Sequence, residues 1–297
     1  MTRSMSVVAS LALSLAMLGT ACGGSTPASP STPESGSVAT TATAPVQLYT
    51  LDCGRIEITD FGSFTDSGKP VGKGKTLADP CYLIKHPKGT LLWDTGLEES
   101  ISQSKEGVAN PVGREFVDAS LREQLAALSL KPADITYVSF SHMHGDHAGN
   151  AKMFEASTWL VNRAEVAAAA KSPPPIGVKA EVAAEVPKVK SKLLDGDEDV
   201  FGDGTVRILQ TPGHTAGHQS LYVKLAKSGP VVLSGDLAHS RENWEKHVVP
   251  AFNASHDNTI ASMKRIEGIL KSDHARFIVQ HSKEDFDAMP KFPAYLE

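Results

Sequence analysis

The stretch Ser141-His142-Met143-His144-Gly145-Asp146-His147 directly follows the apolar run Ile135–Phe140, which is typical of a β-strand. Within six residues it holds four potential metal ligands: His142, His144, Asp146 and His147. On a strand, the first two histidines would project to the same side, because side chains alternate with period two. The glycine after them allows a turn that aims the last two ligands at a second cation nearby. Imidazole and carboxylate are ligands that zinc-like divalent ions accept, so the stretch predicts a metal site at a strand end.

The spacing His-x-His-x-Asp-His resembles the signature of the metallo-β-lactamase superfamily. The other motifs of that family appear in the same order along the chain: Asp94-Thr95-Gly96, His214 in Thr211–Thr215, Asp236 after Val232–Gly235, and His281 after Phe277–Val279. The resemblance spans Val46 to about His281, and it departs at Gln280, where the family usually has a glycine.

The pattern of short apolar runs predicts an α/β fold independently of these motifs. Predicted strands occur in both halves of the body: Val46–Leu51, Ile56–Thr59, Cys81–His86, Thr90–Trp93, Ile135–Phe140, Trp159–Val161, Val206–Gln210, Leu221–Leu225, Val231–Leu233 and Phe277–Val279. Helical spacing of apolar residues predicts one helix between Glu115 and Leu128, and a second through Ile260 and Leu270 with Asp257 as its N-cap. Two sheets packed together with helices outside, an αββα sandwich, satisfy this pattern in a single catalytic domain.

The resemblance implies a division of the ligands between two metals. One metal is held by His142, His144 and His214, the other by Asp146, His147 and His281, and Asp236 bridges them. We expect two Zn ions per chain, although Co, Mn or Fe tolerate the same ligands. Asp94 is expected either to accept a hydrogen bond from a ligand histidine or to be a turn-forming residue before Gly96. His218 is close enough to His214 in sequence for a supporting role.

Two metals about 3.5 to 4 Å apart can share a water whose pKa falls toward neutrality, which would supply a bridging hydroxide as nucleophile. Three longer parts of the sequence look like the N-acyl homoserine lactonase branch, which opens the lactone ring of bacterial signalling molecules: Cys81–Ile84 with Leu91–Gly96, Ser141–Asn150, and Thr211–Leu221. We therefore expect a lactonase acting on an acylated lactone, with Asp146 and His239 taking part in catalysis. His239 stands where that branch has a tyrosine, and the alternative for it is a surface loop histidine.

The loop Leu97–Phe116 follows the Asp94 motif, so we expect it to lie over the mouth of the metal site. Phe64, Phe116 and Met143 are candidates for the substrate pocket, and each has core packing as its alternative. Cys53 and Cys81 fall on neighbouring predicted strands, where they could form a disulfide or remain buried thiols.

The first 45 residues predict that the protein is exported, and we expect them to lie outside the folded domain. Residues 4–22 carry no charge, and the run ends Leu18-Gly19-Thr20-Ala21-Cys22, which resembles a lipoprotein cleavage site. We expect a signal peptide over residues 1–22 with lipidation at Cys22, and ordinary secretion is the alternative. Fourteen of the 21 residues from Ser25 to Pro45 are Ser, Thr or Pro, so residues 23–45 predict a flexible tether. The hydrolase domain then comprises residues 46–297. We expect it to be periplasmic or tethered to the membrane, with the lipid on Cys22 as its only membrane contact.

The charge balance limits the partners of the chain, but several functions remain as alternatives. With 29 Lys and Arg against 34 Asp and Glu, the net charge is −5, so we expect no nucleic-acid partner. Within the same fold, a β-lactamase, an aryl ester hydrolase and a phosphotriester hydrolase remain alternatives. A glyoxalase II type thioesterase is disfavoured, because the 16 residues after His281 are too few for the helical C-terminal domain that binds glutathione in that enzyme. Outside enzymes, the alternative is a non-catalytic zinc-binding lipoprotein. The oligomeric state is left open.

Overall fold

The structure, a computed structural model, describes residues 44–297. The predicted signal peptide (1–22), the lipidation site Cys22 and residues 23–43 of the predicted tether lie outside these residues. In the described part of the chain, no helix is long and apolar enough to cross a membrane.

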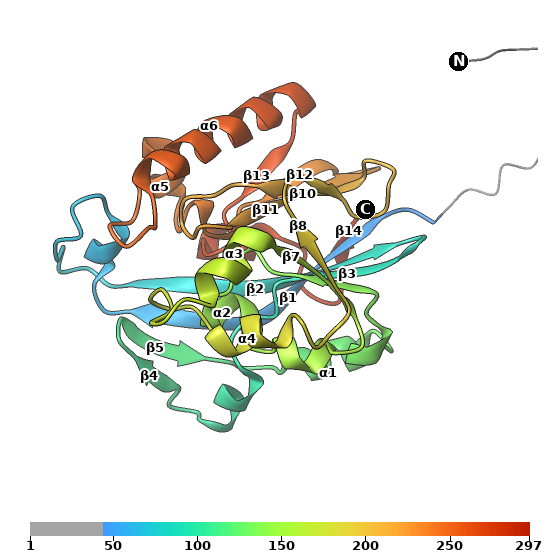
Figure 1. Cartoon of the computed structure of the whole chain (residues 1–297), viewed down its shortest axis with the longest axis horizontal. Helices are drawn as coiled ribbons and strands as arrows, with labels where there is room; N and C mark the ends of the chain where they lie inside the picture. Colours follow the sequence, from blue (N-terminus) through green and yellow to red (C-terminus); the bar gives the residue numbers. More distant parts are fainter. Residues whose placement is uncertain (1–43) are drawn as a thin grey trace, which may run out of the picture. The chain divides into compact units, whose positions relative to one another are not determined.

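The described chain forms two mixed sheets, the first built mostly from its earlier part and the second from its later part (Figure 1). The first sheet has the order β4-β5-β1-β2-β3-β6-β7-β8, and β14 pairs with β1 at its side. Its strands are β1 (Gln47–Ile58), β2 (Lys75–His86), β3 (Gly89–Trp93), β4 (Val108–Asn110), β5 (Gly113–Phe116), β6 (Tyr137–Ser139), β7 (Thr158–Asn162), β8 (Ser191–Leu194) and β14 (Tyr295–Leu296). The pairs β3–β6, β6–β7 and β7–β8 are parallel.

The second sheet has the order β13-β12-β11-β10-β9. Its strands are β9 (Glu198–Asp199), β10 (Val206–Gln210), β11 (Gln219–Leu225), β12 (Gly229–Leu233) and β13 (Arg276–Ile278). The β12–β13 pair is parallel, and β10 runs in the same direction as β12 because each is antiparallel to β11. The carboxyl ends of β10, β12 and β13 therefore meet at one edge of this sheet.

The helices cover the outer faces of the two sheets. They are α1 (Leu121–Ala127), α2 (Gly145–Ala148), α3 (Arg163–Ala169), α4 (Ala180–Glu185), α5 (Arg241–Lys246), α6 (His256–Asp273) and α7 (Lys283–Ala288). Short 3-10 helices occupy Phe61–Phe64, Glu99–Gln103, Pro132–Asp134, Ala151–Phe154 and Gly235–Leu237. In Figure 1, α6 lies over the second sheet, whereas α1 to α4 lie on the side of the first.

Separate hydrophobic clusters fill the layers of this arrangement. The cluster between the sheets joins side chains of the first sheet, such as Tyr82 and Trp93, to side chains of the second, such as Val206 and Leu221. A second cluster packs the first sheet against α1, α3 and α4, and a third packs the second sheet against α6. The predicted αββα sandwich is confirmed.

Several predicted element boundaries are wrong. The two strands expected over Val46–Leu51 and Ile56–Thr59 are one strand, β1, which bulges between Asp52 and Arg55. Gly54 lies in that bulge with φ 137°, a conformation that favours glycine.

The helix expected from Glu115 begins only at Leu121. Glu115 and Phe116 belong to β5, which pairs with β1. Ser120 and Glu123 form a capping box that starts α1 at Leu121, and the side chain of Val117 is buried in a cluster with residues of β1 and β2 instead of on a helix.

The expected N-cap of the long helix is wrong by two residues. Ser255 caps α6 by accepting a hydrogen bond from the backbone N–H of Asn258, and Asp257 lies in the first turn of that helix.

Cys53 and Cys81 form a disulfide between β1 and β2, with their Cα atoms 5.7 Å apart. The bridge lies beneath the turn that follows β3, because a Cβ placed on Gly96 would lie 2.2 Å from the Cβ of Cys53. Of the two alternatives that the sequence leaves open, the structure therefore contains the disulfide.

Candidate metal centre

Seven histidine and aspartate side chains gather where strands of both sheets end. Their potential ligand atoms form two groups, each within 4.8 Å: His142, His144, His214 and Asp236 in the first, and Asp146, His147 and His281 in the second. His142 to His147 follow β6 of the first sheet, whereas His214, Asp236 and His281 follow β10, β12 and β13 of the second. The structure thus brings together all seven residues that the sequence predicts as ligands.

The local geometry of the histidine motif differs from the prediction. His142 and His144 lie beyond the end of β6 and not on a strand, and His144 is the N-cap residue of the one-turn helix α2. Strand alternation is therefore the wrong explanation for their convergence. The connection from β6 to α2 directs both side chains to the same group, and their rings lie 4.3 Å apart between centroids.

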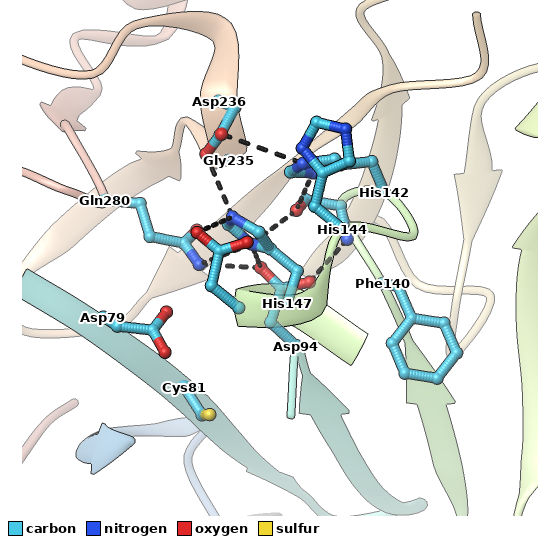
Figure 2. Close-up of polar contacts among 12 residues, drawn as sticks. Asp79, Cys81, Asp94, Phe140, His142, His144, His147, Gly235, Asp236 and Gln280 are labelled. Carbon is cyan, nitrogen blue, oxygen red and sulfur yellow. Dashed lines mark hydrogen bonds and ion pairs between the residues drawn. The ribbon is translucent and has the colours of Figure 1, made fainter. Parts of the chain in front are cut away.

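Asp236 lies between the two groups (Figure 2). Its Oδ2 is 3.2 Å from Nε2 of His214 in the first group. Its Oδ1 is 3.1 Å from Nε2 of His147 and 3.0 Å from Nε2 of His281 in the second. One carboxylate oxygen facing each group is the arrangement that a bridging ligand needs.

The donor set fits divalent cations. The Nε2 of His214 lies 3.2 Å from both Nε2 of His142 and Nδ1 of His144, so three ring nitrogens point toward one position. Neutral rings cannot all donate to one another, whereas their lone pairs can converge on a cation. Asp236 Oδ1 is also buried without a hydrogen bond of normal geometry. Nitrogen and carboxylate ligands without sulfur suit zinc and its first-row neighbours.

Electrostatics differ between the two groups. Burial lowers the pKa of His142 and His214 well below the usual histidine value, so these rings are neutral and ready to bind metal. Burial also opposes the charged form of His281, but the Asp236 carboxylate outweighs it and raises the pKa of His281 to about 9. Burial would raise the pKa of Asp236, yet His281 and His147 hold it well below its ordinary value. The second group is therefore the more negative environment.

Most ligand histidines are oriented by a partner on their other ring nitrogen. Nδ1 of His147 lies 2.9 Å from Oδ2 of Asp94, so the hydrogen bond expected at Asp94 is present. Nδ1 of His281 donates to the backbone carbonyl of Ala78 over 2.7 Å, and Nδ1 of His214 contacts Oδ1 of Asn253 over 3.0 Å. Such partners fix the ring and its tautomer in metal sites.

Asp94 itself is held in an unusual conformation. Its φ is 58°, in the left-handed region, and its carboxylate also accepts from the backbone N–H of Ser141 over 2.6 Å. Nε2 of Gln280 donates to the same carboxylate over 2.7 Å (Figure 2). The residue that departs from the family pattern therefore supports Asp94, while His281 still reaches the second group.

His239 is buried, with only 2% of its surface exposed, so the surface-loop alternative is wrong. Its Nε2 lies 3.0 Å from Oδ2 of Asp236. Its ring packs edge-on against Phe64 at 5.0 Å and Phe252 at 5.7 Å between centroids. Phe252 is 44% exposed and also packs against the ring of His214, so an apolar surface borders the first group.

Not every predicted pocket residue lies at the site. Phe64 does, through its contact with His239. Met143 does not, because its side chain is 1% exposed within the core beneath the first sheet, and that prediction is wrong. Phe116 lies on β5 with the Arg55 guanidinium 4.3 Å from its ring centroid, and its substrate contact stays a prediction. The Leu97–Phe116 segment that contains it forms a short helix and the β4–β5 hairpin at the edge of the first sheet.

Three further residues shape the centre, of which sequence reasoning missed Glu165 and Asn253. Glu165 accepts hydrogen bonds from two ligand-bearing loops, and Asn253 contacts His214. Nε2 of His218 accepts from the backbone N–H of Asp236 over 2.8 Å, and burial lowers the pKa of His218 to about 4. Only His218 was near enough to a motif to be suspected.

The sequence profile of the metallo-β-lactamase superfamily matches residues 76–281, a segment that contains all seven side chains. The chain belongs to the metallo-β-lactamase superfamily. Within this superfamily, it is 30% identical to the N-acyl homoserine lactonase AttM of Azorhizobium caulinodans over 85% of this chain and 99% of AttM. It is 31% identical to an N-acyl homoserine lactonase of a Bacillus species over 84% of this chain and 98% of that enzyme.

Solved structures of N-acyl homoserine lactonases also align with most of the chain. An N-acyl homoserine lactone hydrolase with the product N-hexanoyl-L-homoserine bound at its catalytic metal centre aligns with a TM-score of 0.73 and 30% identity, over 84% of this chain and 98% of that one. A single-residue mutant of the Bacillus thuringiensis lactonase AiiA, with N-decanoyl-L-homoserine at its active site, aligns with a TM-score of 0.72 and 29% identity, over 84% of this chain and 98% of that one.

Proposed function

We propose that the protein is a dinuclear metal-dependent hydrolase that opens the lactone ring of N-acyl homoserine lactones. The observation that carries the proposal is the pair of histidine and aspartate groups joined by Asp236. This centre occurs in a chain that matches N-acyl homoserine lactonases over 98–99% of their length.

We propose two zinc ions as the native metals, with cobalt, manganese or iron as possible substitutes. His142, His144 and His214 would hold one ion, Asp146, His147 and His281 the other, and Asp236 would bridge them. Bound there, the two ions would polarise the lactone carbonyl and lower the pKa of water toward neutrality.

His239 is the side chain placed to donate a proton, and Asp146 lies on the other side of the centre. Nε2 of His239 faces Oδ2 of Asp236, so its N–H points at the centre from the side of the first group. When the ring C–O bond breaks, the departing alkoxide needs a proton, and His239 can donate it directly. Oδ2 of Asp146 lies 3.6 Å from Nε2 of His281, and its partly exposed carboxylate borders the second group.

The apolar surface beside the first group supports an acylated substrate. Phe64 and the exposed ring of Phe252 flank His239, so the acyl chain can pack on aromatic carbon while the lactone carbonyl faces the ligand groups. This arrangement favours an acyl lactone over a substrate without an apolar group.

Export, with a lipid at Cys22, completes the proposal. The uncharged segment Ser4–Cys22 supports a signal peptide, and the disulfide Cys53–Cys81 supports an oxidising compartment. Labelled palmitate should enter the full chain and be lost in Cys22→Ala. Secretion of the processed protein without label would instead indicate an ordinary signal peptide.

Acid release tests the reaction. The zinc-loaded hydrolase domain (residues 46–297) is mixed with short- and long-chain N-acyl homoserine lactones in a weak buffer that contains a pH indicator. Nitrocefin, an aryl ester and a phosphotriester are tested in parallel. Fast lactone opening is the expected result. Failure of fully metallated protein to open any lactone would contradict the proposal. The substrate assignment would then move to whichever parallel compound reacts, or to a zinc-binding protein if none does.

A further inference from the structure

The buried carboxylate of Glu165 on α3 contacts both loops that carry the three histidines of the first group. Its Oε1 accepts a hydrogen bond from the backbone N–H of Met143 over 3.0 Å. Its Oε2 accepts one from the backbone N–H of Gly217 over 2.9 Å. The residue is 3% exposed, so water does not compete for these bonds.

The two donors lie close to the ligands in sequence. Met143 stands between His142 and His144, and its side chain is anchored in the core beneath the first sheet. Gly217 follows His214 by three residues, in the connection from β10 to β11 of the second sheet. One carboxylate therefore joins the three histidines of the first group across the boundary between the sheets.

The backbone approaches Glu165 too closely for any other residue at position 217. A Cβ on Gly217 would lie 2.3 Å from the backbone nitrogen of Glu165. Asn162 caps α3 at the same place, accepting from the backbone N–H of Ala164 over 2.7 Å. Among the described residues, no basic side chain forms an ion pair with Glu165, so its two backbone bonds have no charged competitor.

We propose that Glu165 is a positioning residue that sets the distance between His214 and the pair His142 and His144. The second group does not depend on it, because its histidines are oriented by Asp94 and by the carbonyl of Ala78. The inference rests on the metal pair of the proposed function and is independent of the substrate.

Glu165→Gln tests this assignment, because it keeps the shape of the side chain but turns an NH₂ group toward one of the two N–H donors. Zinc affinity is measured by competition with a chromogenic chelator. Loss of a residue that orients metal ligands through hydrogen bonds typically weakens metal binding about 10- to 100-fold. We expect a weakening of that size for one of the two ions and no change for the other.

Two ligand-deleted backgrounds identify which ion is affected. In His281→Ala, which damages the second group, Glu165→Gln should still weaken the remaining ion. In His142→Ala, which damages the first group, it should have no further effect. Equal weakening in both backgrounds would show a general loss of stability and overturn the assignment, as would unchanged affinity in Glu165→Gln itself.

The control is Asp199→Asn. Asp199 also accepts from two backbone N–H groups, those of Gly202 and Gly204, but it is exposed at the end of β9. It should leave both affinities unchanged, and an effect as large as that of Glu165→Gln would contradict a specific role. If Glu165→Gln does not fold, Glu165→Asp, which is too short to reach both donors, must show the same selective weakening. Absence of zinc binding by the wild-type protein would refute both the metal pair and this inference.

Discussion

The carboxyl of Asp79 is buried beside the second group with a single hydrogen-bond partner. Its Oδ2 accepts from the backbone N–H of Leu97 over 3.0 Å, and its Oδ1 has no hydrogen-bond partner. Figure 2 shows this carboxyl below His147 and Gln280. Burial, and next the charge of Asp146, raise the pKa of Asp79 well above its ordinary 3.8. In the metal-free protein, the unfolded chain therefore releases this proton from about pH 4 upward while the folded chain retains it.

Asp79→Asn should consequently flatten the pH dependence of stability in metal-free protein. In the wild type, the free energy of unfolding falls as pH rises from about 4 through the raised pKa of Asp79. The amide can still accept from Leu97 but does not ionise. Urea unfolding of the metal-free protein at several pH values measures the difference, which should favour the variant increasingly as pH rises. A variant less stable than the wild type across that range would contradict the assigned pKa direction.

His239→Phe should slow lactone opening while leaving both metals bound. The ring contacts Asp236 but belongs to neither ligand group, so the variant loses a proton donor and keeps the metal ligands. A lost general acid typically costs about 100-fold or more in kcat. Turnover and metal content are measured on the same sample, with His256→Phe, an exposed histidine at the start of α6, as control. Unchanged kcat in His239→Phe would remove its catalytic role.

Short motifs made the seven ligands predictable, because four of them follow one apolar strand at the spacing His-x-His-x-Asp-His and each of the other three follows a further apolar strand. Glu165 was beyond reach for the opposite reason. It binds backbone N–H groups of residues 22 and 52 positions away, and no side-chain pattern records such bonds. Met143 lies between two ligand histidines in sequence, but its side chain is buried in the core beneath the first sheet.

At the scale of elements, the start of α6 matters for the first group. The loop before it is tied to the loop of His214, since the backbone N–H groups of Ala254 and Ser255 donate to the carbonyls of His214 and Gly213 over 3.0 and 2.9 Å. The side chain of Ser255 caps the helix at this junction.

Ser255→Ala should therefore lower the free energy of unfolding by about 1 kcal/mol, a typical cost of losing an N-cap. For a domain of this size, that corresponds to a decrease of about 2–4 °C in Tm. Asp257→Ala is the matched comparison, because the sequence favoured Asp257 as the cap. Thermal unfolding should show the larger loss in Ser255→Ala, and the reverse order would contradict the capping geometry.

Element type was predictable wherever apolar spacing was unambiguous, as in β10, whose bounds match the prediction. The predicted helix from Glu115 failed because Val117, Leu121 and Leu125 are buried for different reasons. Val117 packs beside β1, whereas the two leucines pack beneath the first sheet. Helical spacing of apolar residues in the sequence does not reveal that these residues pack in different hydrophobic clusters.

At the scale of the whole molecule, the disulfide Cys53–Cys81 closes a loop with a sequence separation of 28 residues. Its removal should reduce the free energy of unfolding by about 3–4 kcal/mol through the entropy of the unfolded chain. Guanidinium unfolding of Cys53→Ser/Cys81→Ser against the oxidised wild type measures this difference. Equal stability of the two proteins would show that the bridge contributes nothing to the fold.

The layered architecture followed from counting strands and helices in the two halves, but the way the halves join did not. β14, at the far end of the chain, pairs with β1 at its beginning. Two residues of strand carry too little pattern to be recognised, so this closure could be found only in the folded chain.

The division of the ligands between the two sheets has a practical consequence for protein engineering. The earlier half of the body supplies His142, His144, Asp146 and His147, and the later half supplies His214, Asp236 and His281. Neither half contains all seven ligands, so lactone hydrolysis would report that both halves have folded and associated. The loop between β8 and β9 is accordingly a natural place to split the gene for a two-fragment complementation reporter.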